Sequence, residues 1–225
     1  MKKAAIIATL LLSGPTLADT ADQNGTVASS TKNAPDVIET LPVARWDHVG
    51  GSDKWTLATL SALRQHGRAL PAMVPGDIAD WCPAYTEADA DQRKAFWVGF
   101  LSALTKHEST HRPTAVGGGG RWFGLTQIAP ATARLYGCEA RSGAALKNPT
   151  SNLSCAVRIM SRTVPRDGVV SRGMRGVAAD WGPLHNSRKR NDMKAWTLSQ
   201  SYCQPIETKR PKERSASLTR SGGDR

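Results

Sequence analysis

The sequence predicts a mainly α-helical domain that is stapled by disulfide bonds. Residues 91–110 and 152–162 place apolar side chains at the spacing of one helix face. No stretch alternates apolar and polar residues for long enough to predict a sheet of any size. Four cysteines lack a C-x-x-C pair, which favours structural disulfides over a redox motif or a zinc ribbon: Cys82, Cys138, Cys155 and Cys203.

Residues 1–18 have the build of a secretory signal peptide. Lys2 and Lys3 precede an apolar run from Ala4 to Leu12, and small residues follow up to Ala18. The run is far shorter than the ~20 residues that span a bilayer, and no cysteine follows it as a site for a lipid anchor. We therefore expect a periplasmic or secreted protein that begins near Asp19 and has no integral membrane segment.

The chain is strongly basic, with a formal net charge of +11. Removing the signal peptide takes away two lysines and no acid, which lowers this charge by two, to +9. Such a charge favours anionic partners: nucleic acid, an acidic membrane surface or an anionic wall polymer. A soluble surface with a basic tail accounts for the charge equally well.

The four cysteines allow three disulfide connectivities. We favour Cys138–Cys155, which closes a short loop and stabilises by about 3 kcal/mol on chain-entropy grounds. Cys82–Cys203 would then tie the end of the domain back to its start. An exported protein meets the oxidising conditions that such bonds need.

The first half of the chain predicts a leader followed by a helix. Residues 19–45 are polar and lack periodic apolar positions, which indicates a mobile leader before a domain over residues 46–203. Leu57, Leu60 and Leu63 predict a helix from Ser52 to His66, which Gly67 ends. Residues 68–91 are interrupted by prolines, which favours turns and one short helical segment.

The strongest helix prediction covers residues 91–110. Its apolar stripe runs from Phe96 to Leu104, so Glu108, four residues further on, is expected on or beside the buried face in the last turn. Pro113 prevents the helix from continuing. The four glycines at 117–120 predict a flexible spacer, because the Lys-Ser/Thr of a nucleotide-binding loop is missing.

The second half predicts further helices and a tail. A helix is expected from Pro130 to near Gly137, another over 152–162, and weaker ones over 173–181 and 191–202. Residues 204–225 are basic and polar, which predicts a disordered tail.

His107-Glu108-Ser109-Thr110-His111 matches the H-E-x-x-H pattern, which holds zinc when both imidazoles share one helix face. Here the second histidine falls in the final turn, beside Pro113. A third ligand is also required, and no downstream acid or histidine stands at a suitable position. A zinc peptidase is therefore a minor alternative, and we expect no metal or other cofactor.

Glu108 also begins a longer series of motifs. Ser109, Pro113 and Ala115-Val116 follow it, then Gly124-Leu125-Thr126-Gln127-Ile128 and Pro130-Ala131-Thr132-Ala133, and later Gly137, Pro149 and Asn152. In this order and near this spacing, the motifs resemble the lytic transglycosylases of the soluble (SLT) type, which share the goose-type lysozyme fold. The resemblance covers about residues 92–203 and implies a lysozyme-like helical domain.

The resemblance implies that Glu108 is the single catalytic acid and base. The enzyme would cleave the MurNAc–GlcNAc bond of peptidoglycan glycan strands and leave anhydro-muramyl ends, without a cofactor. The residue type fits independently, since glycosidic cleavage needs a protonated carboxyl group. A glutamate at a helix end among apolar residues also has a raised pKa.

Substrate contacts are expected around the Gly124–Ile128 motif. Gln127 would line the cleft, the preceding backbone would contact the N-acetyl sugar, and Ser109 would orient the acid. In the family's third motif, Ala-Tyr-Asn, Asp180 takes the place of the tyrosine, followed by Trp181. The expected substrate-binding residues are Ser109, Trp122, Phe123, Gly124, Leu125, Thr126, Gln127, Asp180 and Trp181.

Two alternatives to the transglycosylase stay open. One is a goose-type lysozyme-like hydrolase, in which Asp180 or another acid positions water. The other is an inactive cell-wall-binding or assembly protein that kept the cleft. No nucleic-acid partner is expected, and a secretion-system or wall-synthesis partner is compatible with a small exported enzyme of this kind.

Overall fold

The computed structural model describes residues 40–205. The expected signal peptide, most of the expected leader and nearly all of the expected basic tail lie outside these residues. Ala44 and Arg45, which the sequence places at the end of the leader, pack onto the domain. Ala44 is buried, and the Arg45 backbone N–H donates to Ser102 Oγ at 2.8 Å.

Seven α-helices and one very short hairpin are found in the described part of the chain. The helices are α1 (Asp53–Arg64), α2 (Ala69–Ala72), α3 (Ala90–Ser109), α4 (Pro130–Leu135), α5 (Gly143–Leu146), α6 (Pro149–Asp167) and α7 (Ser187–Leu198). The hairpin pairs β1 (Val116–Gly117) with β2 (Trp122–Phe123) in antiparallel register. The connections contain 3-10 turns at Ile78–Asp80, Pro83–Thr86, Arg172–Met174, Gly176–Ala179, Gly182–His185 and Ser201–Cys203. The prediction of a mainly helical fold is confirmed.

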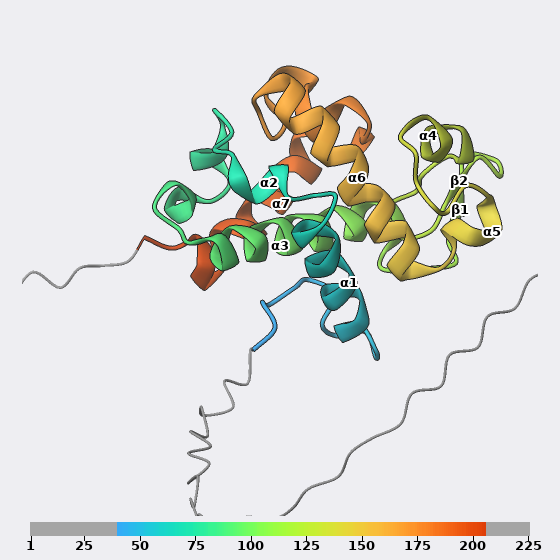
Figure 1. Cartoon of the computed structure of the whole chain (residues 1–225), viewed down its shortest axis with the longest axis horizontal. Helices are drawn as coiled ribbons and strands as arrows, with labels where there is room; N and C mark the ends of the chain where they lie inside the picture. Colours follow the sequence, from blue (N-terminus) through green and yellow to red (C-terminus); the bar gives the residue numbers. More distant parts are fainter. Residues whose placement is uncertain (1–39, 206–225) are drawn as a thin grey trace, which may run out of the picture. The chain divides into compact units, whose positions relative to one another are not determined.

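Helix α3 is the centre of the domain (Figure 1). It begins with a capping box, in which Asp89 accepts from the Gln92 backbone and Gln92 accepts from the Asp89 backbone, satisfying two free N–H groups. Every residue from Ala95 to Thr105 is buried, so the helix is covered on all sides. Helices α1, α2 and α7 each pack directly on it.

Helix α6 is the second long element and packs against α1. It begins at Pro149, three residues earlier than the sequence predicts. Asn148 caps it by accepting from Ser151 N at 3.1 Å, and a proline at the first helical position needs no N–H partner. It ends at Gly168, which takes the left-handed conformation with a φ of 68°.

The expected helix over residues 173–181 is wrong, because two glycines break it. Gly173 and Gly176 have φ values of 69° and 62°, and a Cβ on Gly176 would lie 2.1 Å from Val169 O. The segment forms two 3-10 turns instead. The last helix also lies earlier than predicted, since Asn186 caps α7 by accepting from Lys189 N at 3.1 Å.

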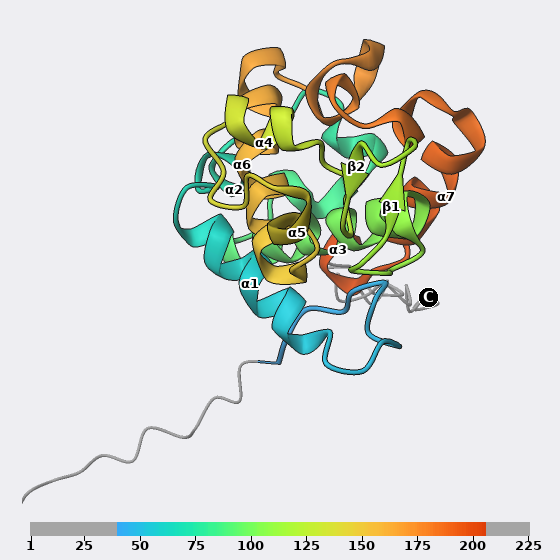
Figure 2. The same ribbon diagram turned by 90° about the vertical axis from the view of Figure 1, so that its right-hand side faces the viewer.

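The elements that follow α3 gather at one end of the domain. In Figure 1 the β1–β2 hairpin, α4 and α5 lie together at the right, and Figure 2 faces this end. The loop between β2 and α4 returns to the end of α3, as the hydrogen bonds described below establish. Residues 105–128 therefore form one unit around the C-terminal end of α3.

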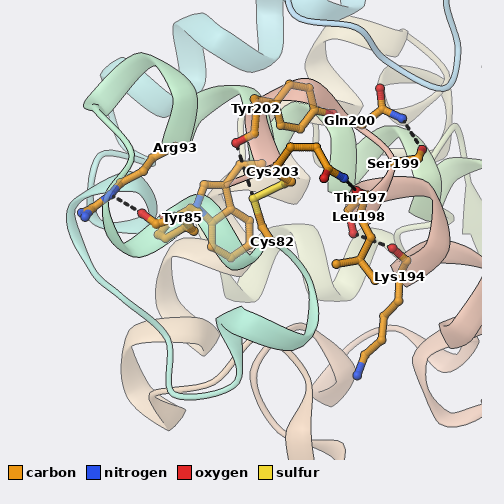
Figure 3. The surroundings of a disulfide bond; sticks show 12 residues. Cys82, Tyr85, Arg93, Lys194, Thr197, Leu198, Ser199, Gln200, Tyr202 and Cys203 are labelled. Carbon is orange, nitrogen blue, oxygen red and sulfur yellow. Dashed lines mark hydrogen bonds between the residues drawn. A yellow bond between two sulfur atoms is a disulfide. The ribbon is translucent and has the colours of Figure 1, made fainter. Parts of the chain in front are cut away.

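Both favoured disulfides are present. Cys138–Cys155 joins the residues just after α4 to α6, and Cys82–Cys203 joins the residue before the Pro83–Thr86 turn to the last turn of the domain. Figure 3 shows the second bond beside Tyr202 and Tyr85. Tyr202 OH donates to Val43 O at 3.2 Å, so the two ends of the described chain meet across α3.

Candidate active site

Glu108 lies in the last turn of α3 and is partly buried. Burial raises the pKa of its carboxyl group to about 7, and Lys189 of α7 opposes this shift. No hydrogen bond or ion pair to the carboxylate is found within residues 40–205. Burial therefore favours the protonated form of the Glu108 carboxyl group, which is the form that a general acid needs.

The backbone turns sharply directly after Glu108. Thr110 and His111 both have positive φ values, 52° and 58°, which are uncommon for residues with a Cβ and unusual for a β-branched threonine. Ser109 is buried, and its hydroxyl donates to Leu125 O at 2.8 Å. The end of α3 is thus joined to the Gly124–Ile128 loop by a side chain adjacent to the acid.

Asn152 of α6 fixes the Gly124–Ile128 loop through hydrogen bonds of its side chain. Its Oδ1 accepts from Thr126 N at 2.9 Å and from Thr126 Oγ1 at 2.7 Å. Its Nδ2 donates to Phe123 O and to Leu146 O, each at 3.0 Å. Asn152 is fully buried, so the loop conformation is fixed by a satisfied polar network inside the core.

Gly124 and Gln127 have backbone conformations that fit this loop. Gly124 has a φ of 80°, and a Cβ there would lie 2.1 Å from Leu146 O, so only glycine fits. Gln127 has a φ of 51°, and its Nε2 donates to Gly124 O at 2.8 Å. Leu125 and Thr126 are fully buried. The structure thus gives Gly124, Leu125 and Thr126 scaffold positions and leaves Gln127 beside a small pocket.

The three aromatic residues differ in exposure. Trp122 is 44% exposed and lines the pocket beside Gln127, with the Arg121 guanidinium 5.2 Å from its ring centroid. Phe123 is half-buried beneath Lys147. Trp181 is 3% exposed, and its Nε1 donates to Thr126 O at 2.9 Å. Trp181, expected from the sequence to bind substrate, contributes to the lining of the same pocket but supports the loop mainly from within the core.

Asp180 lines the same pocket as Trp122 and Gln127. Its carboxylate accepts a hydrogen bond from Tyr136 OH at 3.2 Å. Desolvation raises the pKa of Asp180, although the residue as a whole is exposed. The acid that stands at the expected tyrosine position is therefore paired with a tyrosine supplied by the residue after α4.

The zinc alternative fails on geometry. Helix α3 ends at Ser109, so His111 does not share a helix face with His107. His107 Nε2 lies 2.7 Å from Asp192 Oδ2, while the buried His111 has its Nε2 3.0 Å from Ser102 O. The described residues contain no group of three His, Cys, Asp or Glu side chains that could hold a metal ion. The two histidines of the H-E-x-x-H pattern therefore have separate partners, Asp192 and Ser102.

Comparisons with known proteins agree with this geometry. The family model "Transglycosylase SLT domain" matches residues 86–173. This part of the chain is therefore similar to transglycosylase SLT domains. The matched stretch contains Glu108, Ser109, the Gly124–Ile128 loop and Asn152, while Asp180, Trp181 and α7 lie beyond its end.

Solved structures extend the likeness beyond the SLT match. The wild-type form of Bd0314 DslA and two of its Glu→Gln variants are 28% identical to this chain, with TM-scores of 0.66 and 0.67. Each covers 73% of this chain and 100% of the chain compared. No match was found among curated proteins. The lysozyme-like architecture predicted from the motifs is confirmed.

Sequence reasoning missed two contributors to the candidate site. Lys189 is the one charged group in residues 40–205 that shifts the Glu108 pKa, and it comes from α7, 81 residues later. Tyr136 bonds Asp180 across 44 residues. Neither contact leaves a local sequence signal, because both depend on how helices pack. Asn152 belonged to the quoted motif series, but its role as the anchor of the loop appears only in three dimensions.

Proposed function

We propose that the protein is an exported peptidoglycan lytic transglycosylase in which Glu108 alone acts as acid and then as base. The observation that carries the proposal is the partly buried Glu108 carboxyl, with a pKa of about 7 and no partner in the described part of the chain. It is supported by the SLT match around this residue. The carboxyl is therefore available as a proton donor at neutral pH.

The proposed chemistry needs two proton transfers, one from Glu108 and a later one back to it. Protonated Glu108 donates its proton to the glycosidic oxygen as the bond from this oxygen to C1 of MurNAc breaks, releasing the GlcNAc hydroxyl. The C6 hydroxyl of the same MurNAc then attacks C1, and the Glu108 carboxylate accepts its proton. The product is a 1,6-anhydro-muramyl end, no water is consumed, and Glu108 returns to its protonated state.

The electrostatics of Glu108 support a single-acid reaction. Inverting and retaining hydrolases place a second carboxylate about 5–9.5 Å from the acid. No acidic residue contributes to the Glu108 pKa among the described residues; its causes are burial and Lys189. In DslA, the two glutamates that the variants replace lie 11 positions apart. In this chain, no acidic residue occurs between Glu108 and Glu139, so a second acid at that spacing is missing.

The substrate would lie across the pocket beside the loop. Trp122 offers an exposed ring at the pocket edge, and Gln127 lies next to it. Ser109 and Asn152 keep the loop in place relative to Glu108 through their hydrogen bonds to Leu125 and Thr126. We assign peptidoglycan glycan strands as the substrate, and wall turnover or gap opening for a secretion system as the setting.

The proposal includes export through the signal peptide. The two disulfides fit an oxidising compartment such as the periplasm or the exterior. Within the described residues, no helix is both long and apolar enough to cross a membrane.

A lysozyme-like hydrolase is the second candidate, and Asp180 is the observation that favours it. Its carboxylate lies in the pocket with Gln127 and Trp122, where it would position an attacking water. The two reactions differ by one water in the product, so product mass separates them. A binding protein without activity would yield no soluble fragments.

The test is mass spectrometry of purified peptidoglycan after digestion with the mature protein. We expect muropeptides that are lighter by one water at the muramyl end, and their loss in Glu108→Gln. Glu139→Gln, an exposed acid outside the site, is the matched control and should keep full activity. Reducing muramyl ends that disappear in Asp180→Asn would establish the hydrolase. Binding without cleavage would contradict both enzyme assignments.

A further inference from the structure

A second pocket lies away from the loop, between the Ile78–Asp80 turn, the 171–174 segment and α7. It has a volume of about 320 Å³. Three cationic side chains line it together with two acids: Arg172, Arg190, Lys194, Asp77 and Asp80. Nothing in the proposed reaction uses this pocket, so its charges require a separate account.

The Asp77 carboxylate is already occupied by hydrogen bonds from backbone N–H groups. Its carboxylate accepts from Val170 N at 2.5 Å and from Ser171 N and Arg172 N, each at 2.9 Å. It is 5% exposed and shapes the 170–172 turn. Asp77 therefore makes the wall of the pocket rigid and presents little free acceptor capacity to a ligand.

The cations are only partly compensated. Lys194 pairs with Asp80 at 3.1 Å, and Figure 3 shows Lys194 extending away from the Cys82–Cys203 disulfide. Arg190 donates to Leu184 O at 2.7 Å through one nitrogen, which leaves its other N–H groups. The Arg172 guanidinium, which lies over Gly76, has no hydrogen bond or ion pair within the described range.

We propose that this pocket binds a carboxylate of the stem peptide carried by the glycan strand, through Arg172 and Arg190. The inference rests on the proposed function and deepens it, because it names the form of peptidoglycan that the enzyme prefers. Guanidinium groups present a planar fork of N–H donors that matches a carboxylate.

The surroundings favour a peptide carboxylate over a phosphate. The pocket carries three positive and two negative charges, a balance that suits a monoanion better than a multiply charged phosphate. Met174, 64% exposed, and Leu184 add an apolar wall for the aliphatic part of an amino acid.

Helix α7 connects this pocket to the acid. The charge of Lys189 lowers the pKa of Glu108, and the next residue, Arg190, lines the pocket. One turn of α7 thus supplies a side chain to the pocket and a charge that influences the acid. The muramyl sugar at the cleaved bond is also the sugar that bears the peptide.

The test compares two substrates of equal strand length: glycan strands with stem peptides, and the same strands stripped by an amidase. We expect kcat/KM of the wild type to be about tenfold higher on the peptide-bearing strands. Arg172→Gln should remove most of this preference while leaving kcat/KM on stripped strands unchanged. Arg172→Gln/Arg190→Gln should remove it entirely. Equal kcat/KM values on both substrates in the wild type, or equal losses on both in Arg172→Gln, would overturn the inference.

A matched control and a binding measurement separate this inference from the proposed function. Arg188→Gln removes an exposed cation from the same helix turn outside the pocket and should keep the preference. If the wild type cleaves neither substrate, the proposed function has failed, and binding of an isolated stem tripeptide by calorimetry decides the pocket. Binding should weaken at least tenfold in Arg172→Gln and with a peptide whose carboxylates are amidated. Tighter binding of inorganic phosphate than of the peptide would contradict the carboxylate assignment.

Discussion

At the scale of single residues, Glu108 owes its properties to its place in α3. Burial of the carboxyl group in the last turn of this helix raises the Glu108 pKa to about 7. Lys189 opposes the shift, so the balance between burial and one lysine sets the pH range in which the acid is protonated.

This balance predicts a pH profile. If Glu108 must be protonated for the first step, kcat/KM should fall about tenfold between its acidic plateau and pH 8, since the pKa is about 7. Lys189→Met removes a charge that favours the carboxylate, so the pKa should rise and the falling limb should move to higher pH. Initial rates between pH 5 and 9 measure both effects. Arg188→Met is the control, and an identical limb in Lys189→Met and wild type would exclude the role of Lys189.

The same pKa predicts a stability difference. Glu108 is raised from 4.5 to about 7, so the folded state keeps a proton that the unfolded chain loses between these pH values. The contribution of protonated Glu108 to the free energy of unfolding is therefore fully present below pH 4.5 and is lost as the pH rises through 7. Glu108→Gln cannot ionise and should exceed the wild type by about 2–3 kcal/mol at pH 8, with no gain at pH 4. Urea unfolding at both pH values tests this, and a variant that is less stable at pH 8 would contradict it.

At the scale of elements, one side chain of α6 fixes the Gly124–Ile128 loop, which Ser109 joins to the end of α3. Replacing Asn152 with alanine would leave the Thr126 N–H and two carbonyls without partners in the core. We expect a loss of about 2–4 kcal/mol in unfolding free energy, and a fall in kcat/KM at temperatures where the variant is still folded. Asn148→Ala removes only the cap of α6 and should lose about 1 kcal/mol with kcat/KM unchanged. Equal kinetic losses in both variants would argue against a positioning role.

The same elements show which features a sequence can predict. Helix α3 was located to within one residue, because its apolar stripe and Pro113 act locally. The 173–181 segment was misread, because Gly173 and Gly176 take positive φ values that the apolar pattern did not reveal. Glu108 was located by its motif, whereas Lys189 and Tyr136 reach the site through helix packing. The burial of Trp181 was missed for the same reason, since a tryptophan beside a motif can face either the cleft or the core.

At the scale of the whole molecule, the two disulfides act on different parts of the chain. Cys138–Cys155 closes 17 residues around α5, while Cys82–Cys203 closes 121 residues and encloses α3, the loop and α7. The last turn also packs on α3, where a Cβ on Gly99 would lie 2.0 Å from Tyr202 OH. The second bond therefore secures the contact between the end of the domain and its central helix.

The difference in loop length predicts a difference in stability. Chain entropy assigns about 5 kcal/mol to the 121-residue loop and about 3 kcal/mol to the 17-residue loop. Cys82→Ala/Cys203→Ala should therefore lose about 2 kcal/mol more unfolding free energy than Cys138→Ala/Cys155→Ala. Urea unfolding without reductant measures both, and the wild type with reductant should be less stable than either pair variant. All four cysteines are at most 2% exposed, so the alanine replacements remove comparable packing and the comparison isolates the loops. A larger loss from the short loop would mean that native packing around Cys138, and not restriction of the unfolded chain, dominates its contribution.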